Sequence, residues 1–237
     1  MRTHRIFLKD LTQGEVKLLG DEANHLIKVL RVKLGTKVNA FDGKGLEAKG
    51  KIIALEPPSV TLKLELPTKD KLEPFWKLTL AVALLKGDKF ANVVRQGTEI
   101  GVARFVPLLT EYCDVRALKE TKLKRWQSIA QEAAKQSERS VIPTVGKLCD
   151  LSVLKPEVVN LVAHPYSTTT LHDATLALEN KPLDILCVTG PEGGFSNNEI
   201  NMLEEKNFQS IKLGTRILRS ETAPVALAAA LLLPKGL

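Results

Sequence analysis

Two glycine-bearing segments in the C-terminal part of the chain carry the residues best suited to chemistry. The first runs from Thr189 to Ile200 and contains Gly190, Gly193 and Gly194. Glycine has no Cβ, so the backbone of such a loop can approach a ligand closely. The segment follows an apolar run and precedes a predicted helix, and ligands of open α/β sheets bind at the carboxyl ends of strands. The sequence therefore predicts either a ligand-binding loop or a tight structural turn.

The second segment, residues 213–224, also joins a predicted strand to a predicted helix. Ser220 or Thr222 is expected to cap this helix, and Pro224 suits its first turn. The free backbone N–H groups of a helix start bind polar or anionic groups, and Arg219 stands beside them either as a ligand contact or as a solvated charge. Two such loops favour a nucleotide-like ligand. The chain has neither GxGxxG nor GxxxxGK[ST], which argues against a classical dinucleotide enzyme and a P-loop NTPase.

The elements that position these loops alternate between strand and helix after residue 75, which predicts an α/β domain with a parallel sheet over residues 75–237. Ser196 and Glu199 have the spacing of a capping box at the start of one helix. The predicted strands are 78–85, 104–109, 158–163, 185–189 and 210–213, and the other predicted helices end near 100 or cover 118–137 and 222–233.

The first part of the chain has a different pattern. Residues 61–66 alternate strictly between polar and apolar side chains, as a half-buried strand does, and Asp42-Gly43 is a hairpin signal between two such runs. We expect a small β-barrel over residues 1–70 with one short helix at 21–31, followed by a polar linker at 67–74.

Composition points to a polyanionic partner. The chain of 237 residues has a formal net charge of +7 and a pI of about 9.3. Residues 1–72 contain 14 Lys/Arg and 9 Asp/Glu, a net charge of +5, so most of the excess lies in the N-terminal part. This distribution favours nucleic-acid binding there.

The same counts exclude other classes. Three widely spaced cysteines predict no disulfide framework and a cytoplasmic protein, and four histidines without metal-ligand spacing predict no metal. The longest apolar stretch, 223–233, is shorter than the roughly 20 residues that a membrane helix needs, so no membrane association is expected.

The two loops, in their order and spacing, resemble the RsmE-type RNA methyltransferases of the SPOUT superfamily. The resemblance extends over nearly the whole chain. The motifs that carry it are Gly190-Pro191-Glu192-Gly193-Gly194-Phe195-Ser196, Leu213-Gly214, Ile217-Leu218-Arg219, Glu221-Thr222-Ala223, Lys86-Gly87-Asp88, Thr98-Glu99, Arg125-Trp126 and, in the N-terminal part, Lys28-Val29-Leu30-Arg31 with Phe41-Asp42-Gly43. One departure is Gln96-Gly97, where the family has Lys-Ala.

The resemblance implies a C-terminal SPOUT domain with a deep trefoil knot behind a PUA-like RNA-binding barrel, and a homodimer. It implies S-adenosyl-L-methionine (SAM) as the cofactor and N3 of a uridine in the decoding region of 16S ribosomal RNA, in the small ribosomal subunit, as the target. Alternatives are a catalytically silent RNA-binding protein and an enzyme for another RNA position. The cofactor residues that it implies are Thr189, Gly190, Glu192, Gly194, Leu213, Gly214, Ile217, Leu218, Thr222 and Ala223.

Methylation at N3 removes a proton, so the protein must stabilise negative charge on the base. A preorganised cation does this, which makes Arg219 the leading catalytic candidate, with Arg139 as a second one. Glu221 or Glu192 is a candidate to take or relay the proton; the alternative is that Glu221 only orients Arg219 through a salt bridge.

RNA contacts are expected in the N-terminal part. Basic side chains there would bind phosphates and position the RNA, whereas the alternative is a solvated basic surface. For His25, a core or capping role competes with a base contact. The candidate RNA-binding residues are Arg2, Arg5, His25, Lys28, Arg31 and Lys33.

Overall fold

The computed structural model describes residues 3–70, 73–176, 178 and 183–235. The chain divides into two compact units. The first consists of residues 1–72 together with 134–142, and the second of residues 73–133 together with 143–237.

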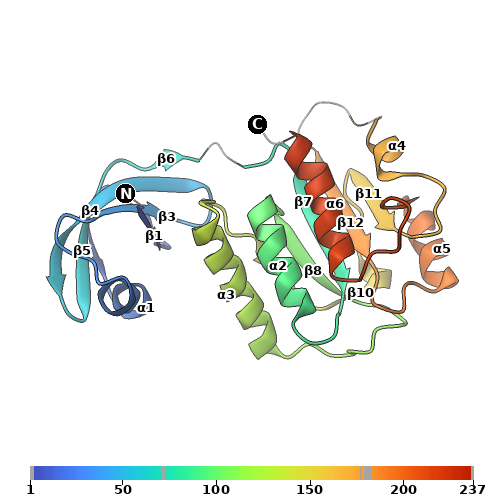
Figure 1. Ribbon diagram of the computed structural model, residues 1–237, viewed down its shortest axis with the longest axis horizontal. Coiled ribbons are helices and arrows are strands. Elements are labelled where there is room, and N and C mark those ends of the chain that lie inside the picture. The colour runs from blue at the N-terminus through green and yellow to red at the C-terminus, as the bar shows by residue number, and fades with distance from the viewer. Residues whose placement is uncertain (1–2, 71–72, 177, 179–182, 236–237) are drawn as a thin grey trace. The chain divides into compact units, whose positions relative to one another are not determined.

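The first unit is a mixed sheet of six strands with one helical segment (Figure 1). The strands are β1 (His4–Phe7), β2 (Gly14–Leu18), β3 (Lys37–Phe41), β4 (Leu46–Glu56), β5 (Ser59–Leu64) and β6 (Thr68–Lys69). They pair in the order β1-β3-β4-β5-β2, with β6 added to β4. Of these pairs β1–β3 is parallel and the others are antiparallel. Strands β1 and β2 end this path of described pairings, so closure into a barrel remains a prediction.

The predicted helix at 21–31 is present but changes geometry. Helix α1 (Gly20–Asn24) continues directly into a π-helical turn, His25–Val29. The segment packs its apolar side chains, such as Leu26, into the core between the strands. Arg31 then has a φ of 47°, which ends the helical run.

Residues 134–142 pack with the first unit, although the sequence analysis placed them in the C-terminal domain. The N–H of Gly45 donates to the carbonyl of Ser140 at 3.1 Å, and the N–H of Ile142 donates to the carbonyl of Gly43 at 2.9 Å. These partners lie far apart in the sequence, so no local sequence pattern predicts their pairing.

Arg5 is a second correction, because it does not face solvent as a phosphate contact would. Its side chain is only 8% exposed and lies 3.3 Å from the carboxylate of Glu47. The guanidinium also donates to the carbonyl of Arg139 at 2.9 Å and stacks over the ring of Phe41 at 4.9 Å. Arg5 therefore joins residues 134–142 to the sheet of the first unit.

Arg5→Ala should destabilise the protein by about 2–4 kcal/mol, because it leaves a carboxylate and a carbonyl without their charged donor. Denaturant unfolding followed by circular dichroism measures this change. The matched control is Arg31→Ala, which removes an exposed arginine from the same unit and should cost under about 0.5 kcal/mol. Equal midpoints for the two variants would contradict a structural role for Arg5.

The second unit is built on an all-parallel sheet, which confirms the predicted class. Its strands are β7 (Lys77–Ala83), β8 (Arg104–Leu109), β9 (Thr144–Val145), β10 (Cys149–Asp150), β11 (Val159–Ala163), β12 (Asp184–Thr189) and β13 (Gln209–Ile211). The order is β10-β8-β7-β12-β11-β13, with β9 paired to β8. The central strands are almost wholly buried and apolar, as strands covered on both faces are.

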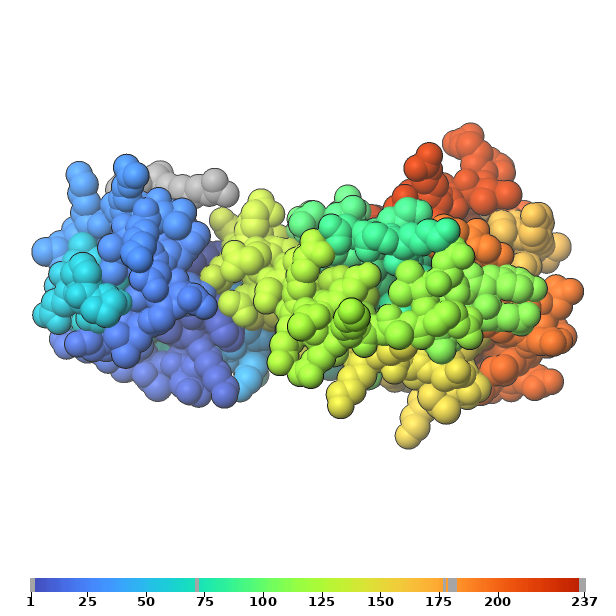
Figure 2. All heavy atoms as spheres, turned by 90° about the horizontal axis from the view of Figure 1, so that it is seen from below, coloured from blue at the N-terminus to red at the C-terminus, as the bar shows by residue number. Residues whose placement is uncertain are grey.

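Helices cover both faces of this sheet (Figure 1). They are α2 (Lys89–Ile100), α3 (Glu120–Gln136), α4 (Leu171–Leu176), α5 (Asn197–Glu205) and α6 (Thr222–Leu232). Helices α2 and α6 pack against each other on one face, and Phe90 of α2 stacks on Trp126 of α3 with ring centroids 4.1 Å apart. Figure 2 shows α2 and α3 side by side in green. Leu203 of α5 packs into the apolar cluster on the other face.

The Gln96-Gly97 departure has a packing explanation. A Cβ on Gly97 would come within 2.7 Å of the ring of Phe105, which is fully buried on β8. Glycine lowers the intrinsic stability of a helix by about 1 kcal/mol relative to alanine, but here it lets α2 approach a bulky neighbour. Gln96 is exposed, so this departure changes the contact between helix and sheet and leaves the two predicted loops untouched.

Candidate functional site

A cavity of about 660 Å³ opens at the carboxyl ends of three neighbouring strands of the second unit. Its walls are the segments that follow β11, β12 and β13, together with the start of α2. The volume falls in the range of about 300–1,000 Å³ that small-molecule sites occupy. Both glycine-bearing segments line it, so the structure brings together the loops that the sequence singled out.

Most of the predicted cofactor residues face this cavity. Thr222, the first residue of α6, is the exception and is not part of the lining. The predicted residues that do line it are Thr189, Gly190, Glu192, Gly194, Leu213, Gly214, Ile217, Leu218 and Ala223.

The first loop is held in place at its C-terminal end. The capping box is present: Ser196 accepts from the N–H of Glu199, whose carboxylate accepts from the N–H of Ser196 at 3.0 Å. The same carboxylate, buried at 7% exposure, accepts from the N–H of Glu111 at 2.8 Å. A Cβ on Gly190 would lie 3.0 Å from the ring of Phe195, so a larger residue there would press on this ring.

The second loop presents open backbone to the cavity. Gly214 has a φ of +79°, and a Cβ built on it meets no atom within 4 Å. Across the cavity wall, the Oγ1 of Thr189 is buried and has no hydrogen-bond partner among the described residues. A buried hydroxyl without a partner is unusual in a folded protein, and a bound ligand would satisfy it.

An ion-pair cluster joins three walls of the cavity. Lys89 at the start of α2 lies 2.8 Å from the carboxylate of Glu192 and 3.3 Å from that of Glu221. Its hydrogen bond to Glu192 raises the pKa of Lys89. Burial raises the pKa of Glu192. The hydrogen bond from Lys89, the positive charge of Lys89 and hydrogen bonds from backbone N–H groups outweigh burial, so the pKa of Glu192 is lowered overall. The pKa of Glu221 is lowered first by its own backbone N–H and then by Lys89. Both carboxylates are therefore ionised at neutral pH.

This cluster overturns the alternative for Glu221. The carboxylate pairs with Lys89 and accepts from the hydroxyl of Ser220 at 3.1 Å, instead of orienting Arg219. Arg219 is exposed on the cavity wall, and its guanidinium has no ion pair or hydrogen bond within the described part of the chain. The capping prediction for Ser220 or Thr222 was wrong, since no side chain caps α6, whereas Pro224 does lie in its first turn.

Sequence reasoning missed part of the lining. Lys89 and Lys212 line the cavity, as does the segment His164-Pro165-Tyr166, which follows β11. The signal was present: 164–166 comes directly after a predicted strand, and the rule that selected the glycine loops applies equally there. Four cations, Lys89, Lys212, Arg216 and Arg219, line the cavity with two carboxylates, so its net charge is positive.

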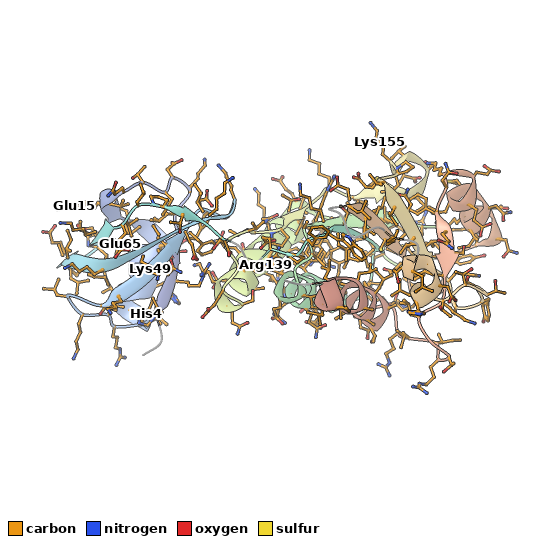
Figure 3. The ribbon with its side chains drawn as sticks, turned by 90° about the horizontal axis from the view of Figure 1, so that it is seen from above. His4, Glu15, Lys49, Glu65, Arg139 and Lys155 are labelled. Carbon is orange, nitrogen blue, oxygen red and sulfur yellow. The ribbon has the colours of Figure 1, made fainter. Side chains whose placement is uncertain are left out.

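The other candidate residues belong to the first unit. Arg139, labelled in Figure 3, is only 6% exposed, belongs to the first unit and is not part of the cavity lining. His25 is exposed, which does not fit a core role. It is the C-cap of α1, and its backbone N–H donates to carbonyls of that helix. Lys28, Arg31 and Lys33 are exposed as RNA contacts would be, whereas Arg2 lies outside the described residues.

Within the described residues, no group of three or more His, Cys, Asp or Glu side chains has an arrangement that could hold a metal ion. No helix in the described ranges is long and apolar enough to cross a membrane. The three cysteines are free thiols, and burial strongly raises the pKa of Cys187.

The fold and the site together define an RNA methyltransferase with an attached PUA domain. The protein-family model of the RNA methyltransferase domain matches residues 71–232 of the sequence. The family model of the RNA methyltransferase PUA domain matches residues 18–65. The ribosomal RNA small subunit methyltransferase E of Synechocystis is 37% identical over 93% of this chain and 74% of its own length. The Bacillus subtilis protein of the same name is 31% identical over 88% of this chain and 86% of its own.

Solved structures agree with these relatives. The small subunit methyltransferase E of Neisseria gonorrhoeae, bound to S-adenosyl methionine, superposes with a TM-score of 0.87 at 30% identity, covering 97% of this chain and 96% of that one. A methyltransferase of Legionella pneumophila, solved with SAM, gives a TM-score of 0.88 at 30% identity, with 97% of each chain covered. The chain thus belongs to the ribosomal RNA small subunit methyltransferase E family, which confirms the resemblance seen in the sequence.

Proposed function

We propose that this protein transfers a methyl group from SAM to N3 of a uridine in the decoding region of 16S ribosomal RNA. The observation that carries the proposal is the cavity at the ends of β11, β12 and β13, which unites both family loops beside the exposed Arg219. Relatives that match most of the chain are named for action on small-subunit ribosomal RNA, and structural neighbours were solved with SAM. The proposal includes the trefoil knot of the SPOUT fold, a homodimer and a cytoplasmic location beside the ribosome.

The residues around the cavity fit SAM. The open backbone at Gly214 leaves room for a flat ring system, and the orphaned hydroxyl of Thr189 offers a hydrogen bond to a polar ligand group. Ionised Glu192 and Glu221 suit a ligand with a positive sulfonium. When bound, SAM supplies the electrophilic methyl group, and the protein's task is orientation and electrostatics.

Arg219 performs the central electrostatic task in this proposal. Loss of the N3 proton places negative charge on the uridine ring, and a guanidinium on the cavity wall stabilises that charge through charge-assisted hydrogen bonds. The lowered pKa values of Glu192 and Glu221 make them weak bases, so we assign them to holding Lys89 and balancing charge instead of accepting the proton.

Lys89→Met should weaken SAM binding by about threefold to tenfold, because it removes both ion pairs that hold Glu192 and Glu221 of the two loops against the start of α2. It should also raise the pH at which SAM binding is lost on acidification. In the wild type the lowered carboxyl pKa values keep Glu192 and Glu221 charged until the pH falls below their ordinary range. Without Lys89 those pKa values rise, so protonation begins earlier as pH falls.

Calorimetric titration with SAM across a pH series measures both effects. The control is Lys86→Met. Lys86 stands three residues before Lys89 and outside the cavity lining, and its substitution breaks an exposed ion pair of 2.9 Å with Asp114. If the Lys89 and Lys86 variants bind SAM with the same pH profile, the cluster has no part in cofactor binding.

RNA binding should depend on the exposed basic residues of the first unit. Lys28→Ala combined with Arg31→Ala should weaken RNA association and reduce the slope of log affinity against log salt by about 1 for each lost phosphate contact. SAM affinity should not change. Filter binding over a salt series tests this, and an unaltered slope would place the RNA on another surface.

The proposal as a whole is tested by methyl transfer from labelled SAM to small-subunit RNA. We expect label to enter 16S ribosomal RNA, either free or assembled into subunits. Strong RNA binding without any transfer would favour a catalytically silent RNA-binding protein and overturn the proposal.

A further inference from the structure

Tyr166 is a large aromatic side chain held in the open at the edge of the cavity. It is 78% exposed, yet it belongs to the lining together with His164 and Pro165. The ring of His164 packs against it edge-on, with centroids 5.7 Å apart. An exposed tyrosine that lines a ligand cavity leaves a flat apolar face available to a flat ligand.

The turn that carries Tyr166 is firmly anchored to the sheet. The N–H of His164 donates to the carbonyl of Ile211 at 2.8 Å, and the N–H of Ser167 donates to the carbonyl of His164 at 3.1 Å. The hydroxyl of Ser167 donates to the carbonyl of Ser210 at 2.8 Å. Strands β11 and β13 thus fix both sides of the turn, so the ring is presented without a large ordering cost.

The charges beside this ring identify the chemistry of its ligand. Lys212, Arg216 and Arg219 line the same cavity. An exposed aromatic face next to a group of cations is the combination by which proteins bind unpaired nucleotides: the base stacks on the ring and the cations hold phosphates.

We propose that Tyr166 is the stacking platform for the unpaired target base of the RNA, and so a residue that determines substrate positioning. This inference rests on the proposed function and adds a residue on the segment after β11. A base that leaves its helix loses stacking, and the face of Tyr166 restores it beside Arg219. The adenine of the cofactor is the other nucleobase that reaches this cavity, and the experiment separates the two.

The test compares Tyr166→Ala, Tyr166→Leu and Tyr166→Phe in single-turnover methylation of small-subunit RNA at saturating SAM. Loss of the ring should lower kcat/KM for RNA by roughly 5- to 100-fold in the Ala and Leu variants, the range that one base stack provides. The Phe variant should stay within about twofold of the wild type, because it keeps the π face. SAM affinity, measured by calorimetry, should not change in any of the three.

Val158→Ala is the matched control. Val158 is 69% exposed and precedes the same strand β11, at the end opposite Tyr166. This variant should methylate RNA as the wild type does. Wild-type activity also separates the two levels of the argument: if the wild type does not methylate RNA, the proposed function fails, whereas normal Ala and Leu variants overturn only the role of Tyr166.

A binding measurement tests the stack without catalysis. Trp76 and Trp126, the two tryptophans of the chain, are 2% and 0% exposed, so Tyr166→Trp introduces an exposed fluorophore. Its emission should be quenched by a uridine-containing single-stranded RNA and much less by SAM alone. Quenching by SAM but not by RNA, or a fall in SAM affinity in Tyr166→Ala, would assign the platform to the cofactor adenine and overturn the inference.

Discussion

Replacing Arg219 with alanine should lower the single-turnover rate of RNA methylation by about 100-fold or more, comparable to the loss of one oxyanion donor. The side chain is exposed on the cavity wall and has no partner in the described structure, so it is free to meet charge that develops on the substrate. An interaction that strengthens in the transition state raises the chemical rate more than it raises binding. SAM affinity should therefore fall much less than the rate.

Two further variants separate this role from loop shaping. Arg219→Lys should recover only part of the rate, since a point charge does not replace a planar fork of donors. Glu221→Gln should not reproduce the loss, because Glu221 pairs with Lys89 and not with Arg219. A near-normal rate in the alanine variant, or equal losses of rate and SAM affinity, would rule out the catalytic assignment.

Gly214→Val should reduce SAM affinity by at least about 100-fold, the equivalent of about 2.7 kcal/mol. In the free protein a side chain at this position meets no atom within 4 Å, so the added methyl groups fill space that only a ligand would need. The positive φ of +79° adds backbone strain of about 1–3 kcal/mol, which lowers stability independently of the ligand.

Gly35→Val controls for that strain. Gly35 has the same φ of +79° and equally open surroundings, but it lies in the first unit. Both variants should lose thermal stability, and only Gly214→Val should lose SAM binding in calorimetry. Equal SAM affinity in the two folded variants would contradict the placement of the cofactor at this loop.

Local sequence patterns predicted much of the fold of both units. The strand at 104–109 has the predicted bounds, and α6 ends one residue before the predicted end. These elements have strong periodicity or clear flanking signals, such as Pro224 in the first turn of α6. The capping box at Ser196 was equally legible, since both partners lie within one turn of the helix.

The features that the sequence did not predict depend on contacts between distant residues. Lys89 meets Glu192 across 103 positions, and Arg5 meets Ser140 across 135. A lysine at a helix start and an arginine in a strand have no local mark that distinguishes a buried partner from a solvated charge. For this reason Lys89 was missed and Arg5 was wrongly assigned to RNA. The two loops were found because their glycines and their position between a strand and a helix are visible in the local sequence.

Mapping the methylated nucleotide tests the central claim most directly. The protein is incubated with SAM and with 16S ribosomal RNA made without modifications, both free and assembled into small subunits, and nuclease fragments are analysed by mass spectrometry. The account predicts one added methyl group, on N3 of a uridine in the decoding region, and its loss in Arg219→Ala. A methyl group on a ribose hydroxyl or on a base outside the decoding region would contradict it.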